Sequence, residues 1–178
     1  MADRIIQTET LQSIANSIRG SEQGAKIAVE DFAEKITEVA GGEIVLKQLL
    51  ERNITDIVIP EGFTNLGNYA FAYCGQLQNV TFSKDILAIG QNAFYFCGNL
   101  KNIVIPDTVQ YINSSAFNSC FNLENVVIGS GIQNIANYVF AGIKADAVIN
   151  CKFSEGAVSG APWGAPNGVT INYDYTGE

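Results

Sequence analysis

Residues 54–76 read ITDIVIPEGFTNLGNYAFAYCGQ, and the same 23-residue pattern returns three more times along the chain. The later copies are LQNVTFSKDILAIGQNAFYFCGN (77–99), LKNIVIPDTVQYINSSAFNSCFN (100–122) and LENVVIGSGIQNIANYVFAG (123–142). Six columns are apolar in every copy, namely Ile54/Leu77/Leu100/Leu123, Ile57/Val80/Ile103/Val126, Ile59/Phe82/Ile105/Ile128, Phe63/Ile86/Val109/Ile132, Leu66/Ile89/Ile112/Ile135 and Phe71/Phe94/Phe117/Phe140. A fixed period of this kind predicts a solenoid, in which equivalent side chains of successive turns stack into one core.

Each copy also contains its own strand and turn signals. The alternation of Ile57 and Ile59 predicts a half-buried strand, and Pro60 ends it because proline has no N–H for a sheet. A second short apolar pair follows, and we then expect a helical or 3₁₀ step that carries Ala70 and Phe71. Turns that stack like parallel strands lie about 4.8 Å apart, which places successive phenylalanines on one another.

The repeated motif is specific enough to indicate a family. Leu-x-x-Ile-x-Ile-Pro…Ile-Gly-x-x-Ala-Phe-x-x-Cys resembles the BspA-type leucine-rich repeats over residues 54–142. Two copies depart from it, since Phe82 and Ser83 replace the Ile-Pro step and the fourth copy ends without cysteine. The resemblance implies a short parallel-sheet solenoid used for binding and not for catalysis.

The N-terminal segment has helical periodicity instead. Residues 43–53 place three leucines on one face, and we expect them to form a helix that caps the first repeat. Residues 1–40 predict a helical hairpin too small to hold a core of its own. Its apolar stripes must pack on each other, on the solenoid or on another subunit, and we favour another subunit. The residues expected at that docking or oligomer contact are Leu11, Ile14, Ile18, Phe32, Ile36 and Val39.

The C-terminal segment continues the repeat. Ile149 and Cys151 fall 23 residues after Val126 and Ile128, so a fifth strand is expected in register. We expect residues 143–178 to form a C-terminal β cap. The predicted fold class is therefore an α+β solenoid with about four 23-residue leucine-rich repeats, an N-terminal hairpin, a capping helix and this β cap.

Composition argues against several functions. The chain has 178 residues, a net charge of -8 and no histidine. The acidic balance disfavours nucleic acid or an anionic membrane as partner. Histidine is the usual general base and zinc ligand, so we expect no enzyme, no catalytic residue, no cofactor and no metal. The first 20 residues lack the apolar run of a secretory signal, and no run approaches the roughly 18 residues of a membrane span, so we expect synthesis in the cytoplasm.

Four cysteines belong to the repeat pattern. Cys74, Cys97 and Cys120 are spaced by 23 residues, and Cys151 lies in the fifth strand. Cysteines on adjacent turns fall within disulfide range, but three stacked cysteines cannot all pair. We favour buried thiols over a disulfide or redox device.

Exposed aromatic residues are the candidate binding residues. Tyr73, Tyr95, Phe96 and Phe121 point outward next to the cysteine column in this pattern, and aromatics on a rigid surface anchor sugars or proteins. The alternative, which we favour, is that they lean over neighbouring turns and complete the packing. Trp163 is a further candidate, although a plug for the C-terminal cap is the favoured role.

A polar column runs along the first strands at Asp56, Asn79, Asn102 and Asn125. It either lines a binding face or forms a ladder of hydrogen bonds from turn to turn, and we favour the ladder. Residues 54–142 carry only five acidic and two basic side chains, which makes a nearly neutral, amide-rich surface suited to carbohydrate or protein contacts.

Both ends resemble modules of virus particles. The run LQSIANSIRG…KIAVEDFAEKITEV is similar to a short module of bacteriophage and prophage tail or other virion proteins, and SEGAVSGAPWGAPNGVTINYDYTGE is similar to a module that follows such repeats. The resemblance implies a non-enzymatic virion protein that forms homo-oligomers through its N-terminal helices. Its partners would be other virion proteins and a host surface protein or glycan. The alternatives are a bacterial surface adhesin and an intracellular protein-binding scaffold.

Overall fold

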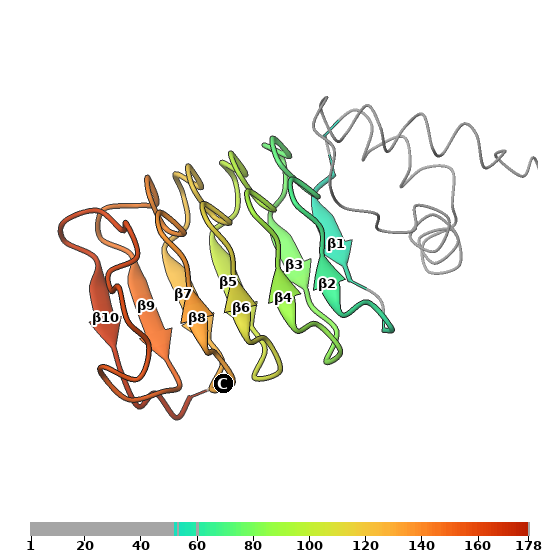
Figure 1. Ribbon diagram of the computed structural model, residues 1–178. Coiled ribbons are helices and arrows are strands. Elements are labelled where there is room, and N and C mark those ends of the chain that lie inside the picture. The colour runs from blue at the N-terminus through green and yellow to red at the C-terminus, as the bar shows by residue number, and fades with distance from the viewer. Residues whose placement is uncertain (1–51, 53, 60, 178) are drawn as a thin grey trace, which may run out of the picture.

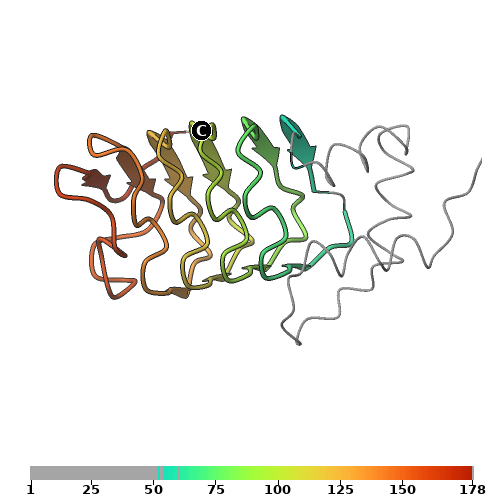
Figure 2. The same ribbon diagram turned by 90° about the horizontal axis from the view of Figure 1, so that it is seen from above.

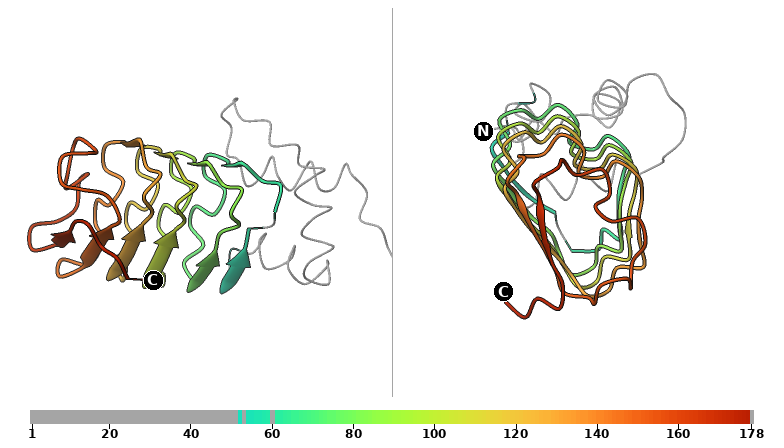
Figure 3. Two further views of the ribbon diagram at one scale, coloured as in Figure 1. Left: turned by 90° about the horizontal axis from the view of Figure 1, so that it is seen from below. Right: turned by 90° about the vertical axis from the view of Figure 1, so that its left-hand side faces the viewer.

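The computed structural model describes residues 52, 54–59 and 61–177, which form a β-solenoid of stacked turns (Figure 1). Seen from above, the turns lie side by side along one axis (Figure 2). Seen along that axis, they nearly superimpose (Figure 3). These described residues contain strands and turns but no helix, so this part is a β-solenoid and not the predicted α+β fold. The predicted hairpin (1–40) and nearly all of the predicted capping helix (43–53) lie outside the described residues.

Each turn contributes one strand to each of two parallel arrays. The first array holds β1 (Asp56–Val58), β3 (Asn79–Thr81), β5 (Asn102–Ile105), β7 (Asn125–Ile128), β9 (Val148–Cys151) and β10 (Thr170–Asn172). The second holds β2 (Asn65–Leu66), β4 (Ala88–Ile89), β6 (Tyr111–Ile112) and β8 (Asn134–Ile135). The register advances by one repeat per strand, as in the pairing of Ile103 with Val126. The 23-residue period is therefore the length of one turn.

The C-terminal residues extend the same sheet. Strand β9 pairs with β7 so that Ile149 lies beside Val126, which confirms the predicted fifth strand in register. Strand β10 then pairs in parallel with β9. The predicted separate β cap is therefore a continuation of the solenoid, because the last apolar residues follow the existing register instead of starting a new one.

The segments that carry Ala-Phe are turns, and the predicted helical or 3₁₀ step is wrong. Tyr69 and Tyr73 have φ angles of 59° and 63°, which a helix does not contain. The N–H groups of Phe71 and Phe94 donate to the next turn, at Ala93 O (2.7 Å) and Ala116 O (2.8 Å). Hydrogen bonds along the solenoid axis thus replace those of a helix.

The core is a continuous stack of phenylalanines. The rings of Phe71 and Phe94 lie 5.5 Å apart, those of Phe94 and Phe117 lie 5.2 Å apart, and those of Phe117 and Phe140 lie 5.8 Å apart. All four side chains are fully buried. The stacking predicted from the repeat is confirmed. Of the six predicted columns, the members that are only partly buried are Phe63, Val80 and Phe82.

The first array is interrupted between β3 and β5. Strands β1 and β3 form one two-stranded sheet, and β5, β7, β9 and β10 form another, whereas β2, β4, β6 and β8 pair without a break. We call the gap between β3 and β5 the seam. It coincides with Phe82, which stands where other turns have isoleucine and packs edge-on against Phe94 at 6.0 Å. We attribute the seam to this larger ring, which holds β3 away from its neighbour.

Candidate binding surface

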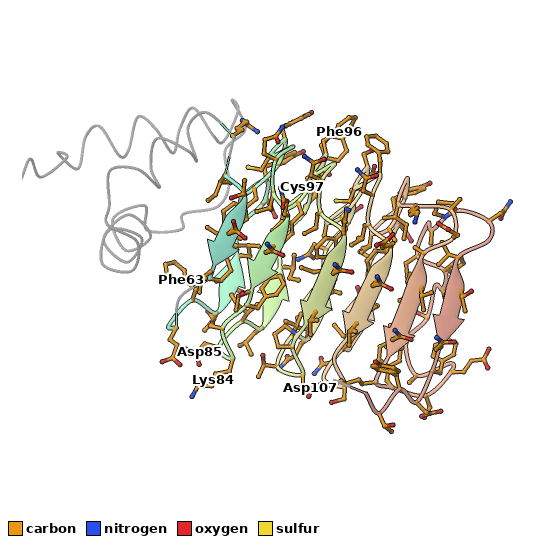
Figure 4. All side chains as sticks on the ribbon, turned by 180° about the vertical axis from the view of Figure 1, so that it is seen from behind. Phe63, Lys84, Asp85, Phe96, Cys97 and Asp107 are labelled. Carbon is orange, nitrogen blue, oxygen red and sulfur yellow. The ribbon has the colours of Figure 1, made fainter. Side chains whose placement is uncertain are left out.

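Four aromatic side chains form a continuous surface strip, which we call the aromatic ridge: Tyr73, Tyr95, Phe96 and Phe121. Ring centroids are 5.3 Å apart for Tyr73 and Tyr95, 4.9 Å for Tyr95 and Phe96, and 5.3 Å for Phe96 and Phe121. The exposed fractions of Tyr73, Phe96 and Phe121 are 53%, 38% and 52%, and Tyr95 is half-buried. Figure 4 shows Phe96 at the outer end of the turn that precedes the strands. The ridge residues therefore pack on one another and still face solvent.

The backbone explains why two of these rings point outward. Tyr73 and Phe96 have positive φ angles of 63° and 61°, a conformation uncommon for aromatic residues. It is held by hydrogen bonds along the axis, from Tyr73 N to Tyr95 O (2.6 Å) and from Phe96 N to Asn118 O (3.0 Å). The equivalent position in the third turn is Ser119, so this column of the ridge ends there.

Phe121 joins the ridge from a different column. A Cβ built at Gly98 would meet the Phe121 ring at 3.9 Å, so the ring covers the position where a side chain would stand one turn earlier. At the other end of the ridge, the Arg52 guanidinium lies 5.5 Å from the Tyr73 ring centroid and also donates to the Ala72 carbonyl. The ridge thus combines a flat apolar surface with one cation at its edge.

Trp163 is placed inside the last turn. Its exposed fraction is 2%, and its indole N–H donates to Ser159 O at 2.9 Å. The ring packs edge-on against Phe140 and Phe153, each at 6.4 Å. This position suits the plug that we favoured, and it leaves the indole out of reach of a ligand on the surface.

The four cysteines are free and buried. The thiols of Cys97 and Cys120 donate to the carbonyls of Phe71 and Phe94, each at 3.2 Å. Burial raises the pKa of Cys74 to about 11 and that of Cys120 and Cys151 to about 12, and it raises the pKa of Cys97 further. Neutral thiols are poor nucleophiles and poor metal ligands, so these side chains are core residues.

The polar column forms a hydrogen-bonded ladder with one gap. Asn79 Nδ2 donates to Asp56 Oδ1 at 2.5 Å, and Asn125 Nδ2 donates to Asn102 Oδ1 at 2.8 Å. The carboxylate of Asp56 has a lowered pKa because Thr55 and then Asn79 donate to it. Within the described residues, no hydrogen bond joins Asn102 to Asn79 across the seam.

Sequence reasoning missed two features of this surface. A second pair in a neighbouring column, from Asn172 Nδ2 to Asn150 Oδ1 at 2.8 Å, extends the amide bonding to β10. The seam also went unnoticed, although the replacement of Ile-Pro by Phe82 and Ser83 was its only signal. The six predicted docking residues between Leu11 and Val39 lie outside the described residues.

Two searches of the described part of the chain found nothing. It holds no group of three or more His, Cys, Asp or Glu side chains placed to bind a metal. Nor does a helix with the length and hydropathy of a membrane span occur in it.

Residues 47–154 match the sequence family described as BspA type leucine rich repeat region (6 copies), which is more than half of the chain. The chain belongs to this family. No curated protein matches the BspA-type sequence studied here.

Two solved structures resemble this BspA-type chain. A leucine-rich repeat protein from Bacteroides ovatus aligns with a TM-score of 0.61 at 18% identity, over 67% of this chain and 30% of that protein. A leucine rich cell surface protein from Faecalibacterium prausnitzii aligns with a TM-score of 0.44 at 22% identity, over 59% of this chain and 37% of that protein. The chain therefore spans well under two thirds of both proteins, and the first likeness shows the fold alone.

Proposed function

We propose that this BspA-type chain is a non-catalytic binding module whose aromatic ridge holds a protein partner. The observation that carries the proposal is the exposure of Tyr73, Phe96 and Phe121 on a hydrogen-bonded scaffold. Aromatic residues and arginine are enriched in the cores of protein interfaces, where they lose little conformational entropy on binding. Arg52 at the end of the ridge adds a donor of this kind.

The charge distribution favours contact through packing and hydrogen bonds. With seven charged side chains in residues 54–142, this surface has little to attract an oppositely charged partner over a distance. We therefore expect an affinity that changes little with ionic strength. No catalytic step is part of the proposal, because the chain has no histidine and its cysteines are buried.

The setting that we propose is a phage or prophage particle, with the ridge presented to a host surface protein or to a neighbouring virion protein. This part rests only on the resemblance of the two end segments to virion modules. It includes the proposal that residues 1–40 dock or oligomerise within the particle. A cell-surface adhesin and an intracellular scaffold remain the alternatives.

Ridge variants test the binding function. We would crosslink the intact chain in particles or cells of the source, identify the attached protein by mass spectrometry, and measure its affinity for the recombinant chain. Phe96→Ala and Phe121→Ala should weaken binding at least tenfold. Tyr138→Ala is the matched control, because Tyr138 is 63% exposed but makes no ring contact with the ridge. Equal affinities for all three variants would contradict the proposal.

Particle analysis tests the setting. Mass spectrometry of purified particles should detect the chain at a fixed ratio to other virion proteins. Deletion of residues 1–40 should leave the solenoid's circular dichroism unchanged and lower the mass measured by light scattering. An unchanged mass, or absence of the chain from particles, would refute the virion assignment and leave the ridge proposal standing.

A further inference from the structure

The seam contains a polar hollow separate from the aromatic ridge. Its volume is about 360 Å³, and its lining residues are Gln78, Asn79, Asn99, Lys101 and Asn102. Four of the five are amides and none is apolar. This volume is near the lower end of the roughly 300–1,000 Å³ of small-molecule sites, most of which are lined by apolar residues. A hollow this polar suits a ligand that is itself covered with hydrogen-bonding groups.

Backbone groups at the seam lack the partners that the same positions have one turn later. There, the N–H groups of Glu124 and Asn125 both donate to Lys101 O, at 2.9 and 3.2 Å. The equivalent donors at the seam are Lys101 and Asn102, and the equivalent acceptor is the Gln78 carbonyl. Within the described residues, these bonds are not formed. Unpaired backbone groups must be satisfied by solvent or by a ligand, because leaving them without any partner is costly.

The side chains across the seam are complementary to a hydroxyl group. Asn79 uses its Nδ2 on Asp56, which leaves its Oδ1 as an acceptor. Asn102 uses its Oδ1 to accept from Asn125, which leaves its Nδ2 as a donor. A hydroxyl placed between them donates to Asn79 Oδ1 and accepts from Asn102 Nδ2, since a hydroxyl is both donor and acceptor.

We propose that the hollow between β3 and β5 is a saccharide-binding site, in which a sugar hydroxyl bridges Asn79 and Asn102 and completes the interrupted amide ladder. Gln78 and Asn99 supply further donors and acceptors for the neighbouring hydroxyls of one or two sugar rings. Lys101 is the one charged residue of the lining, and its ammonium donates to ring or hydroxyl oxygens. The ligand class is a neutral mono- or disaccharide or the end of a longer glycan.

Phe82 provides a variant that acts on the site without touching its lining. The other turns have Ile59, Ile105 and Ile128 in its place, and all three are buried. Phe82→Ile should let β3 pair with β5 and bring Asn102 within hydrogen-bond distance of Asn79. The hollow then closes. This variant should keep or raise the unfolding temperature while it removes saccharide binding.

Solution NMR of the intact chain tests the site. The ¹⁵N-labelled protein would be titrated separately with maltose, cellobiose, lactose and N,N′-diacetylchitobiose, and the side-chain amide signals of Asn79 and Asn102 followed. We expect saturable shifts of both signals with at least one of the four sugars. Asn102→Asp keeps the shape but replaces the donor by an acceptor, so it should weaken that binding at least tenfold, as should Phe82→Ile. Asn172→Ala, in the amide pair at the far end of the sheet, is the matched control and should bind as the parent does.

Three results would overturn the proposal. The first is no saturable shift with any of the four sugars, which would leave only water in the hollow. The second is unchanged binding by both Asn102→Asp and Phe82→Ile. The third is sugar binding that is lost in Phe96→Ala and retained in Asn102→Asp, which would move the saccharide to the aromatic ridge. The protein-binding proposal is tested by ridge variants alone and stands or falls separately.

Discussion

Replacement of Phe117 tests the idea that a continuous aromatic stack holds the solenoid together. Its side chain is fully buried between Phe94, with ring planes 4° apart, and Phe140, with ring planes 11° apart. Truncation of a buried phenylalanine to alanine costs about 3–5 kcal/mol, from lost transfer energy and from the cavity that remains. That is a large share of the roughly 5–15 kcal/mol by which a domain is stable.

Phe117→Leu separates the aromatic contribution from simple burial. Leucine keeps most of the apolar area but removes two stacked pairs, each worth about 0.5–1.5 kcal/mol beyond burial. We therefore expect a loss of about 1–3 kcal/mol, smaller than for Phe117→Ala. Phe121→Ala is the matched surface control, because that ring is 52% exposed. It should change the free energy of unfolding by no more than about 0.5 kcal/mol.

Urea denaturation measures these differences. Circular dichroism follows the strands, and fluorescence follows Trp163, the single tryptophan, which contacts Phe140 next to the substituted position. Both probes should report the same midpoint for a cooperative solenoid. If Phe117→Ala costs less than about 1 kcal/mol, or no more than Phe121→Ala, the reasoning from stacked columns is refuted.

Other consequences follow from the thiols and from close contacts between turns. Because burial raises the thiol pKa from 9.0 in the folded chain, stability should be complete below pH 9 and fall as the pH rises toward 11–12, by up to about 1.4 kcal/mol per pH unit for each thiol; chemical denaturation at pH 8 and 10.5 checks this, and equal stabilities would contradict it. Ellman's reagent should find four thiols in the denatured, unreduced chain and almost none in the native chain, whereas two thiols after denaturation would indicate a disulfide. Gly131→Ala should lower stability by about 1–3 kcal/mol because its Cβ would lie 2.0 Å from Asp107 O, while Gly75→Ala, with nothing within 4 Å, should be close to neutral in the same melt; similar melts for the two would be evidence against the contact. Asp107→Ala should cost about 1 kcal/mol through loss of the hydrogen bond from Ser130 N at 2.9 Å, and an unchanged melting temperature would argue that solvent replaces it.

The repeat columns are the part of the fold that sequence reasoning reached most fully. The pairing of Val126 with Ile149 could be predicted because both residues answer to the same spacing. The Ala-Phe step was read as helical because its apolar residues alone do not distinguish a short helical turn from a turn whose N–H groups donate along the axis. The positive φ angles of Tyr69 and Tyr73 appear only when neighbouring turns supply the acceptors.

The candidate site was predictable in its membership and not in its geometry. Tyr73, Phe96 and Phe121 occupy outward positions in the pattern, but whether they pack on neighbours or stay exposed depends on the distances between turns, and they do both. The hollow at the seam could not be found in this way, because Asn79 and Asn102 look equivalent to every other member of their column.

The amino-acid sequence alone determined that the chain repeats every 23 residues, and hence which side chains meet on successive turns and which form the core. Periodicity records chemical identity at equivalent positions, and burial of apolar columns follows from it. The tertiary structure decided where the turns separate, because the spacing of β3 and β5 depends on how Phe82 fits against Phe94, a ring from a different column. Packing between non-equivalent positions has no period, so only the folded chain reveals it.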